Sequence, residues 1–553
     1  MSYIKTQGRM VLMYKFKNLI LFSLLLSFSS LSGQEVNQAW LARYNGLASG
    51  EDIPVALAID DTGNVYVAGF SEGLGTGKDI LTLKYSPAGN LIWERRYNGP
   101  DNLADRPATL AIDKNGYIYV TGYSTTLVSG TDFLTLKYSP AGAFLWVNRY
   151  NGTGNSNDSA SSLAVDLNGN VYVTGISFGA GTAEDYAIAK YGPSGNLIWV
   201  RRYDGPVKNA DYAAALILDP AGYTYITGSS WGGNSWDMGT LKYDSNGNLI
   251  WLRRYNGGKD ADIASGLALD ASSNLYVVGR TSIWGGNSYY RFLTVKYDSN
   301  GNLIWTKNYQ GYSSNHSFAS ALKVDGSGNI LVTGPSWGIG TSYDFATLKY
   351  DPSGNQQWVM RYNGPSRGGD FPSALAVDSS GNLYVAGSRY TRLGQASYDI
   401  ATIKYSPLGQ EQWSKIFDGG GTDKPTALAV DNKGNLYVTG FNQGTLTSYD
   451  MVTIKYSLCS PTSPQAGDAD SDGKLGLTDV VALVNYIFQK PNYPYCSTNS
   501  YLCWLSGLLC RGDWNGDGRV SLADLLRGVN YVLGKSGGPW EPIPSGACCS
   551  LLP

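Results

Sequence analysis

The stretch ALAVDNKGNLYVTG at residues 427–440 is one copy of a unit that recurs eight times, at intervals of about 53 residues. The closing glycine recurs at Gly69, Gly122, Gly175, Gly228, Gly279, Gly334, Gly387 and Gly440. Near the end of each unit lies a tryptophan, at Trp93, Trp146, Trp199, Trp251, Trp305, Trp358 and Trp413, with the eighth at Trp40. Because Trp40 precedes the first full unit, the eighth unit is divided between the two ends of the repeat region.

Each unit predicts four short β-strands joined by tight turns. In the second unit we expect strands at 109–113, 117–121, 133–138 and 145–150. The first turn is Asp113-Lys114-Asn115-Gly116, where the late glycine can adopt a positive φ. The fifth unit has Ser273 in place of this glycine, so its turn should be strained or different.

A repeat of this length made of short strands is typical of a β-propeller blade. The divided unit indicates a ring, because the first strand can then complete the last blade. We therefore expect an all-β fold, an eight-bladed propeller over residues 38–457 that is closed by an N-terminal outer strand around Trp40.

Two polar positions repeat as regularly as the apolar ones. A lysine recurs in the third strand, at Lys84, Lys137, Lys190, Lys242, Lys296, Lys349, Lys404 and Lys455. An aspartate precedes the first strand, at Asp52, Asp105, Asp158, Asp211, Asp262, Asp370 and Asp423, with Ser317 in the sixth unit. The aspartates could form a ring that holds a cation at the channel mouth, or one Asp–Lys or Asp–Arg contact per blade. Repetition in every blade favours the second, structural explanation.

The loops between the second and third strands vary most in sequence and carry aromatic side chains. The candidate ligand-binding residues are Trp231, Trp236, Trp284, Tyr290, Arg291, Trp337, Tyr343 and Tyr390. These loops share one face of a propeller, where aromatic and arginine side chains can stack on sugars or anchor a protein. The alternative is that they shield neighbouring blades from water.

Composition and the N-terminus limit the possible functions. The formal charge is −2 and His316 is the sole histidine, which argues against nucleic-acid binding, a Ser-His-Asp triad and histidine-based metal catalysis. Lys15 and Lys17 precede an apolar run at 19–28 and small residues up to 33, so residues 1–33 indicate a signal peptide for bacterial-type export. A retained membrane anchor is the alternative. No other segment predicts a membrane span, and we expect a secreted or cell-surface protein.

A separate module is expected after a Ser- and Pro-rich linker at 458–466. Two acidic loops, 468–479 and 513–524, have oxygen ligands at positions 1, 3, 5, 7 and 12 and glycine at position 6, a spacing that fits Ca²⁺. The predicted ligands of the two Ca²⁺ sites are Asp468, Asp470, Asp472, Lys474 (through its carbonyl) and Asp479, then Asp513, Asn515, Asp517, Arg519 (through its carbonyl) and Asp524. An amphipathic helix follows each loop, so residues 467–535 should form a small α-helical calcium-binding domain.

The cysteines are confined to the C-terminal part of the chain. They are Cys459, Cys496, Cys503, Cys510, Cys548 and Cys549, the last two in a tail at 536–553. In an exported protein this clustering predicts disulfides, and the sequence leaves all 15 pairings open.

Both parts of the chain resemble known families. The A-x-D-x-x-G-N-x-Y-V-x-G pattern over residues 39–457 resembles the SBBP family of bacterial β-propeller repeats, which implies the fold and says little about a ligand. Residues 467–535 resemble a type I dockerin, which implies docking to a cohesin-like or cell-surface partner. Loop positions 10 and 11 hold Leu477-Thr478 and Leu522-Ala523, where dockerins often have a Ser-Thr pair.

Two functional classes remain open at this point. The first is a non-catalytic binding or scaffold protein whose propeller face binds a glycan or a protein. The second is a polysaccharide hydrolase or lyase tethered by its dockerin-like module. The first is favoured, because no unit has a carboxylate pair or a nucleophile–base set outside the repeat pattern.

Overall fold

The computed structural model describes residues 36–460 and 550–551, except 259–260, 284–288, 313–314, 392–396 and 445–447. The described residues from 37 onward belong to one compact unit, the propeller. The predicted signal peptide, the calcium-binding domain and the cysteine tail up to Cys549 lie outside the described residues. Within the described ranges, no helix has the length and apolar character needed to cross a membrane.

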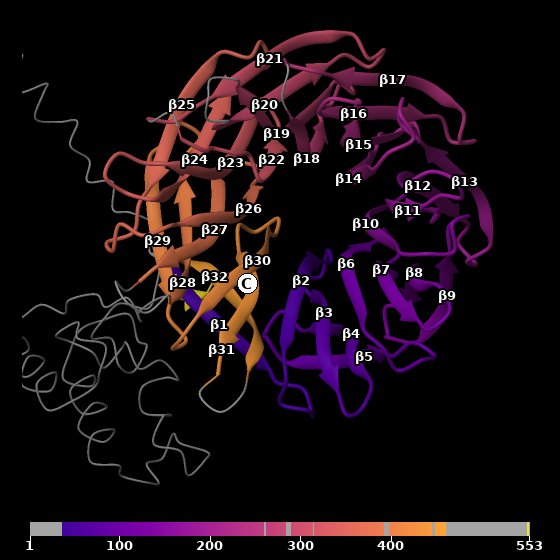
Figure 1. Cartoon of the computed structure of the whole chain (residues 1–553). Coiled ribbons are helices and arrows are strands. Elements are labelled where there is room, and N and C mark those ends of the chain that lie inside the picture. The colour runs from indigo at the N-terminus through magenta and orange to yellow at the C-terminus, as the bar shows by residue number, and fades with distance from the viewer. Residues whose placement is uncertain are drawn as a thin grey trace, which may run out of the picture. The chain divides into compact units, whose positions relative to one another are not determined.

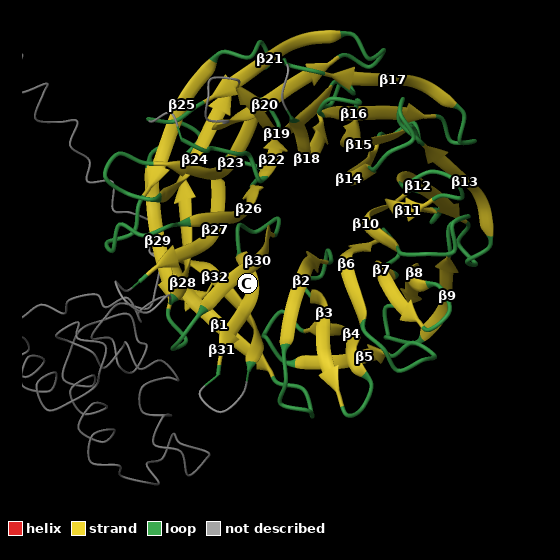
Figure 2. Ribbon diagram, viewed as in Figure 1, coloured by secondary structure: helices red, strands yellow, loops and turns green. Residues whose placement is uncertain are grey.

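The described chain forms eight small antiparallel sheets, arranged as the blades of a propeller (Figure 1). Figure 2 shows only strands and loops in this part of the chain. The first four blades are Asp52–Ile59 (β2), Val65–Gly73 (β3), Gly77–Tyr85 (β4) and Leu91–Tyr97 (β5); Asp105–Ile112 (β6), Ile118–Thr126 (β7), Gly130–Tyr138 (β8) and Phe144–Tyr150 (β9); Asp158–Val165 (β10), Val171–Phe178 (β11), Glu184–Tyr191 (β12) and Leu197–Tyr203 (β13); and Asp211–Leu218 (β14), Thr224–Trp231 (β15), Trp236–Tyr243 (β16) and Leu249–Tyr255 (β17).

The next three blades are Asp262–Leu269 (β18), Leu275–Ile283 (β19), Tyr289–Tyr297 (β20) and Leu303–Tyr309 (β21); Ala321–Val324 (β22), Ile330–Trp337 (β23), Tyr343–Tyr350 (β24) and Gln356–Tyr362 (β25); and Phe371–Val377 (β26), Leu383–Tyr390 (β27), Tyr398–Tyr405 (β28) and Glu411–Phe417 (β29). The eighth contains Asp423–Val430 (β30), Leu436–Gln443 (β31) and Tyr449–Ser460 (β32). Its remaining neighbour is Val36–Tyr44 (β1), in the order β1-β32-β31-β30, and Ser550–Leu551 (β33) pairs with the end of β32.

The Asp-x-x-Gly-Asn turn explains why the first two strands of each blade form a hairpin. In the first blade, the Asp60 carboxylate accepts the backbone N–H groups of Thr62 and Asn64 at 3.0 and 2.9 Å. The Asn64 side chain donates to the same carboxylate at 2.8 Å, and Gly63 has a φ of 84°. The aspartate therefore holds the turn that glycine makes possible.

The cores lie between adjacent blades rather than within one sheet. Tyr66 and Ile80 of the first blade pack in one cluster with Ile118 and Leu134 of the second. On its other side the first blade packs Val67 against Tyr437 and Met451 of the eighth blade. Small residues such as Ala56 and Ala160 are buried in the first strands, where sheets converge on the axis.

A tryptophan and a lysine of one blade donate hydrogen bonds to the same backbone carbonyl of the next blade. Trp93 Nε1 and Lys84 Nζ both donate to the Pro140 carbonyl, at 3.4 and 3.1 Å. The same arrangement joins Trp146 and Lys137 to Pro193, Trp199 and Lys190 to Ser245, Trp251 and Lys242 to Ser299, Trp305 and Lys296 to Pro352, and Trp358 and Lys349 to Pro407. These acceptors lie in the turn between the third and fourth strands.

The junction between the last and first blades has the same contacts. Trp40 in β1 and Lys455 in β32 both donate to the Pro87 carbonyl, at 3.0 and 3.3 Å. The exception is Trp413, whose buried Nε1 has no hydrogen-bond partner among the described residues. The eighth blade has no turn between β32 and β1, because these strands come from opposite ends of the repeat region, so it lacks the carbonyl that Trp413 would need.

The strands differ from the prediction mainly in length. In the second blade, the first strand begins at Asp105 rather than 109, and the second runs to Thr126 rather than 121. The polar residues expected to form a loop instead continue the ladder, with Thr126 opposite Gly130. Tyrosine and threonine favour strands, so Tyr123, Thr125 and Thr126 continue the ladder although their side chains are polar.

The fifth blade keeps the common turn despite its missing glycine. Ser273 N donates to the Asp270 carbonyl at 3.0 Å, as glycine does elsewhere, and Ser273 has a φ of 58°. A side chain in this left-handed region is strained.

Substituting Ser273→Gly should therefore stabilise the propeller by about 0.5–1 kcal/mol, because glycine adopts this conformation without steric cost. Chemical denaturation of the two proteins measures the difference. The reverse change Gly222→Ser, at the matching turn of the fourth blade, should destabilise by a similar amount. Equal stability of Ser273→Gly and the parent would contradict the assigned strain.

Candidate functional site

One face of the propeller is built from variable loops. It carries the hairpins between the second and third strands and the crossings from each fourth strand to the next blade; we call it the hairpin face. The opposite face carries the turns that repeat in every blade. Sequence variation is therefore concentrated on the hairpin face, where a ligand-specific site is expected.

The repeating aspartates begin the first strands, apart from Asp370, which directly precedes β26. They are buried and hold the crossings in place. Asp52 exposes 1% of its surface and accepts the N–H of Gly46 at 2.7 Å. The same bond joins Asp105 to Gly99, Asp158 to Gly152, Asp211 to Gly205, Asp262 to Gly257, Asp370 to Gly364 and Asp423 to Gly419. Each aspartate thus fixes the loop from the preceding blade, which supports the structural explanation of this repeat.

We expected an arginine to contact these first-strand aspartates. The arginines instead pair with a second set of aspartates, which lie in the third strands. Arg96 of the fourth strand pairs with Asp79, in the third strand, at 3.0 Å. The equivalent pairs are Arg202–Asp185, Arg254–Asp237 and Arg361–Asp344, at 2.6 to 2.8 Å. In the seventh blade the cation comes from the second strand instead, as Arg389 pairs with Asp399 at 3.0 Å. The repeating lysines contact the next blade's carbonyl, as described above.

The predicted ligand-binding aromatics of the fourth blade form one group. Trp231 ends β15 and Trp236 begins β16, and their rings meet edge to face with centroids 5.3 Å apart. Trp236 also stacks on Tyr212 at 5.0 Å with an interplanar angle of 24°. Tyr212 is 37% exposed. We call Tyr212, Trp231 and Trp236 the aromatic platform.

Similar pairs occur in later blades. Trp337 meets Tyr343 edge to face at 5.1 Å, and Tyr343 lies 5.4 Å from Phe371 of the next blade. Tyr390 meets Tyr398 at 5.5 Å. These residues are partly buried, so they cover blade edges as well as facing solvent.

In the fifth blade, Tyr290 lies under the Arg280 guanidinium at 4.6 Å and beside the His316 ring at 5.2 Å. Arg291 is paired in register with Thr281. Trp284 lies outside the described residues, as do all the predicted calcium ligands.

Sequence reasoning missed Tyr212, Phe371 and Tyr398 as members of these groups. Tyr212 and Phe371 each follow a residue at the repeating aspartate position, Asp211 and Asp370. Because side chains alternate along a strand, this next residue points away from the buried carboxylate network. An aromatic residue directly after the repeating aspartate was therefore the sequence signal that could have identified Tyr212 and Phe371.

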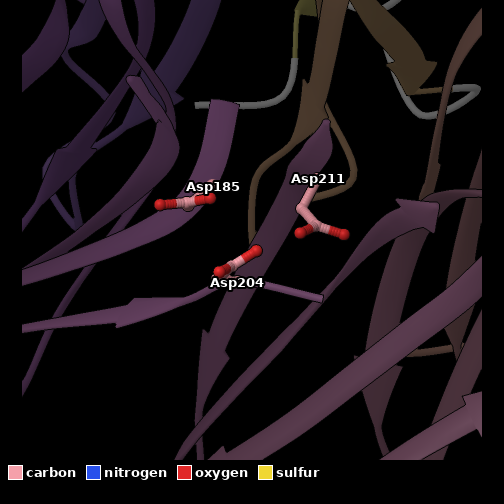
Figure 3. A group of neighbouring side chains, drawn as sticks. All are labelled: Asp185, Asp204 and Asp211. Carbon is pink, nitrogen blue, oxygen red and sulfur yellow. The ribbon is translucent and has the colours of Figure 1, made fainter. Parts of the chain in front are cut away.

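At two crossings between blades, three aspartate side chains lie close together instead of two. Asp185, Asp204 and Asp211 place carboxylate oxygens within 4.8 Å of one another (Figure 3), and so do Asp399, Asp418 and Asp423. Burial raises the pKa of Asp204 and of Asp211. Burial raises the pKa of Asp423 to about 6, although Gly419 and Asn442 donate hydrogen bonds that oppose the rise.

Comparison with known proteins agrees with the repeat. The profile of the SBBP beta-propeller repeat matches residues 92–126, 148–177, 357–388 and 412–440. An uncharacterised WD repeat-containing protein of Acanthamoeba polyphaga mimivirus is 22% identical over 501 residues, which cover 73% of this chain and 34% of that protein. The chain therefore spans about a third of the length of the curated relative that it matches.

Among solved structures, Sqt1 of Chaetomium thermophilum has a TM-score of 0.47 and 11% identity, covering 75% of this chain and 99% of its own. The polysaccharide lyase Uly1 has a TM-score of 0.43 and 13% identity, covering 77% and 94%. An ulvan lyase of polysaccharide lyase family PL25 has a TM-score of 0.41 and 11% identity, covering 75% and 96%. At these scores, none of the three bears on the function of this chain.

The raised pKa of Asp423 predicts a pH dependence of stability. Its folded pKa of about 6 exceeds the ordinary value of 3.8, so the folded state binds this proton more tightly. The free energy of unfolding should therefore fall by about 1–2 kcal/mol through this group as the pH rises from 4 to 6.5. Denaturation of parent and Asp423→Asn across that range isolates the effect, which the variant should lack. Asp61→Asn on an exposed turn is the charge control, and equal slopes in parent and Asp423→Asn would refute the prediction.

Proposed function

We propose that the protein is an exported, non-catalytic binding protein. Its hairpin face binds a glycan or a protein, and its calcium-loaded C-terminal module docks to a cohesin-like or cell-surface partner. The observation that carries the proposal is the aromatic platform, a partly exposed stack of rings held by two neighbouring strands and the start of a third. The proposal for the module rests on the sequence of its two acidic loops.

The geometry of the platform suits a flat, weakly polar ligand surface. The Tyr212 and Trp236 rings stack on each other, so Tyr212, which is 37% exposed, presents its outer side and its polar edge to a ligand. Trp231 supports Trp236 from the side, which limits its rotamers and lowers the entropy lost on binding. The C–H faces of sugar rings and aromatic or proline side chains of a protein both fit such a surface.

Binding is favoured over hydrolysis because the repeated carboxylates already have structural roles. The aspartates at the starts of the first strands hold the crossings, and five of the third-strand aspartates, among them Asp79 and Asp185, pair with arginine. A glycosidase needs two carboxylates with a substrate between them. The alternative function, a polysaccharide hydrolase or lyase, is tested by the same experiment.

Trp236→Ala should reduce binding to the glycan recognised on an array of soluble and cell-wall polysaccharides at least tenfold, because it removes the centre of the platform. Leu127→Ala, an exposed position on the second-blade hairpin, is the matched control and should bind as the parent does. Unchanged binding by Trp236→Ala would exclude the platform as the site. Release of reducing sugars or unsaturated products by the parent would instead identify an enzyme.

We further propose that β1 keeps the ring closed. Trp40 and Lys455 share the Pro87 carbonyl, and Arg43 of β1 donates to Asn442 of β31 at 2.5 Å. Deletion of residues 36–44 should lower the melting temperature by 10 °C or more and expose the edge of β32 to aggregation. Trp40→Phe, which loses the hydrogen bond but keeps most of the packing, should cost about 1 kcal/mol. A deletion variant that melts like the parent would exclude this role.

A further inference from the structure

The group Asp185, Asp204 and Asp211 arises where the repeat changes at the end of a fourth strand, a change that also occurs at Asp418. The residue after the Arg-Tyr pair at the end of each fourth strand is asparagine at Asn45, Asn98, Asn151, Asn256 and Asn363. At the crossing from the third to the fourth blade it is Asp204. Where asparagine is present, two carboxylates lie near each other, one from a third strand and one from the next first strand. Here Asp204 adds a third, as Asp418 does beside Asp399 and Asp423.

The charges at this place are not balanced by the described residues. Arg202 pairs with Asp185 at 2.6 Å, and the nearby Lys208, which lies on the surface, partly offsets Asp204. Three carboxylates thus share one paired arginine and one surface lysine. The group therefore carries net negative charge.

Hydrogen bonding is also incomplete within this group. Asp211 is fully buried, and its Oδ2 accepts the N–H of Gly205 at 2.5 Å. The Ser230 side chain also forms a hydrogen bond with this carboxylate. By contrast, Oδ1 of Asp185, which is 2% exposed, and Oδ1 of Asp204 have no hydrogen-bond partner among the described residues. A buried carboxylate oxygen without a donor is costly, and one cation would remove that cost for Asp185 and Asp204 together.

We infer that these three aspartates bind a divalent cation with a preference for oxygen ligands, for which Ca²⁺ is the probe. Carboxylate oxygens are hard ligands, and opposite ligands of one Ca²⁺ lie up to about 5 Å apart, which accommodates oxygens within 4.8 Å. Water completes the coordination. Asp204 is only partly buried and lies on the loop, so it provides the entry side.

The site adjoins the aromatic platform. Asp211 and Tyr212 are consecutive residues of β14, and their side chains point to opposite faces of the sheet. A bound cation would join the end of the third blade to the start of the fourth, directly beside Tyr212. It would therefore fix the strand that carries one ring of the platform.

The test uses the full chain with Asp468→Ala and Asp513→Ala, which disable the two C-terminal calcium loops. Calorimetric titration with CaCl₂ should detect a site that Asp204→Asn weakens at least tenfold. Five other units have asparagine at the position of Asp204, so Asp204→Asn should fold. Asp204→Ser is a second variant, and it should weaken calcium binding by the same factor. Asp61→Asn controls for the loss of one surface charge and should titrate as the parent does.

Thermal melting gives an independent measurement. In EDTA, Asp204→Asn should melt at or above the parent temperature, because it relieves repulsion among three carboxylates. In 5 mM CaCl₂ the melting temperature of the parent should rise more than that of Asp204→Asn. The difference in melting temperature between the two proteins should therefore narrow or change sign. Identical calcium isotherms, or identical calcium-induced shifts, for parent and Asp204→Asn would overturn the inference.

Discussion

The propeller depends on one backbone carbonyl in each of its first seven blades. Each turn between the third and fourth strands presents a backbone oxygen that accepts both a tryptophan N–H and a lysine ammonium from the preceding blade. The tryptophan ring also packs against the tyrosine of its own second strand, as Trp93 does against Tyr66 at 6.0 Å. One position therefore combines hydrophobic burial, a neutral hydrogen bond and a charge-assisted one, and its repetition sets the spacing and rotation between sheets.

Much of this architecture could be predicted from the sequence. The glycine and tryptophan spacing indicated eight four-stranded blades, and Trp40 indicated the divided one, because such periodicity is local and repeats eight times. The partners of charged residues could not be predicted. Arg96 pairs with Asp79 rather than Asp52 because the register between β4 and β5 places Arg96 close to the third-strand residue. This register was known only from the three-dimensional structure.

The candidate site was predictable only in part for the same reason. Trp231, Trp236, Trp337 and Tyr343 stand out as aromatic residues in variable loops. Tyr212 does not, because it lies in a strand among alanines, and only the fold brings it onto Trp236. Asp204 was also overlooked, because an Asn-to-Asp change within a repeat is minor in sequence and matters only once Asp185 and Asp211 are its neighbours.

The pairing of β1 with β32 also bears on how the chain is made. β1 leaves the ribosome about 400 residues before β32. Until then β1 has no partner, and its edge must be kept from pairing with other chains. Completion of the eighth blade therefore coincides with the end of synthesis of the repeats. If the chain is exported unfolded, this last step takes place after translocation.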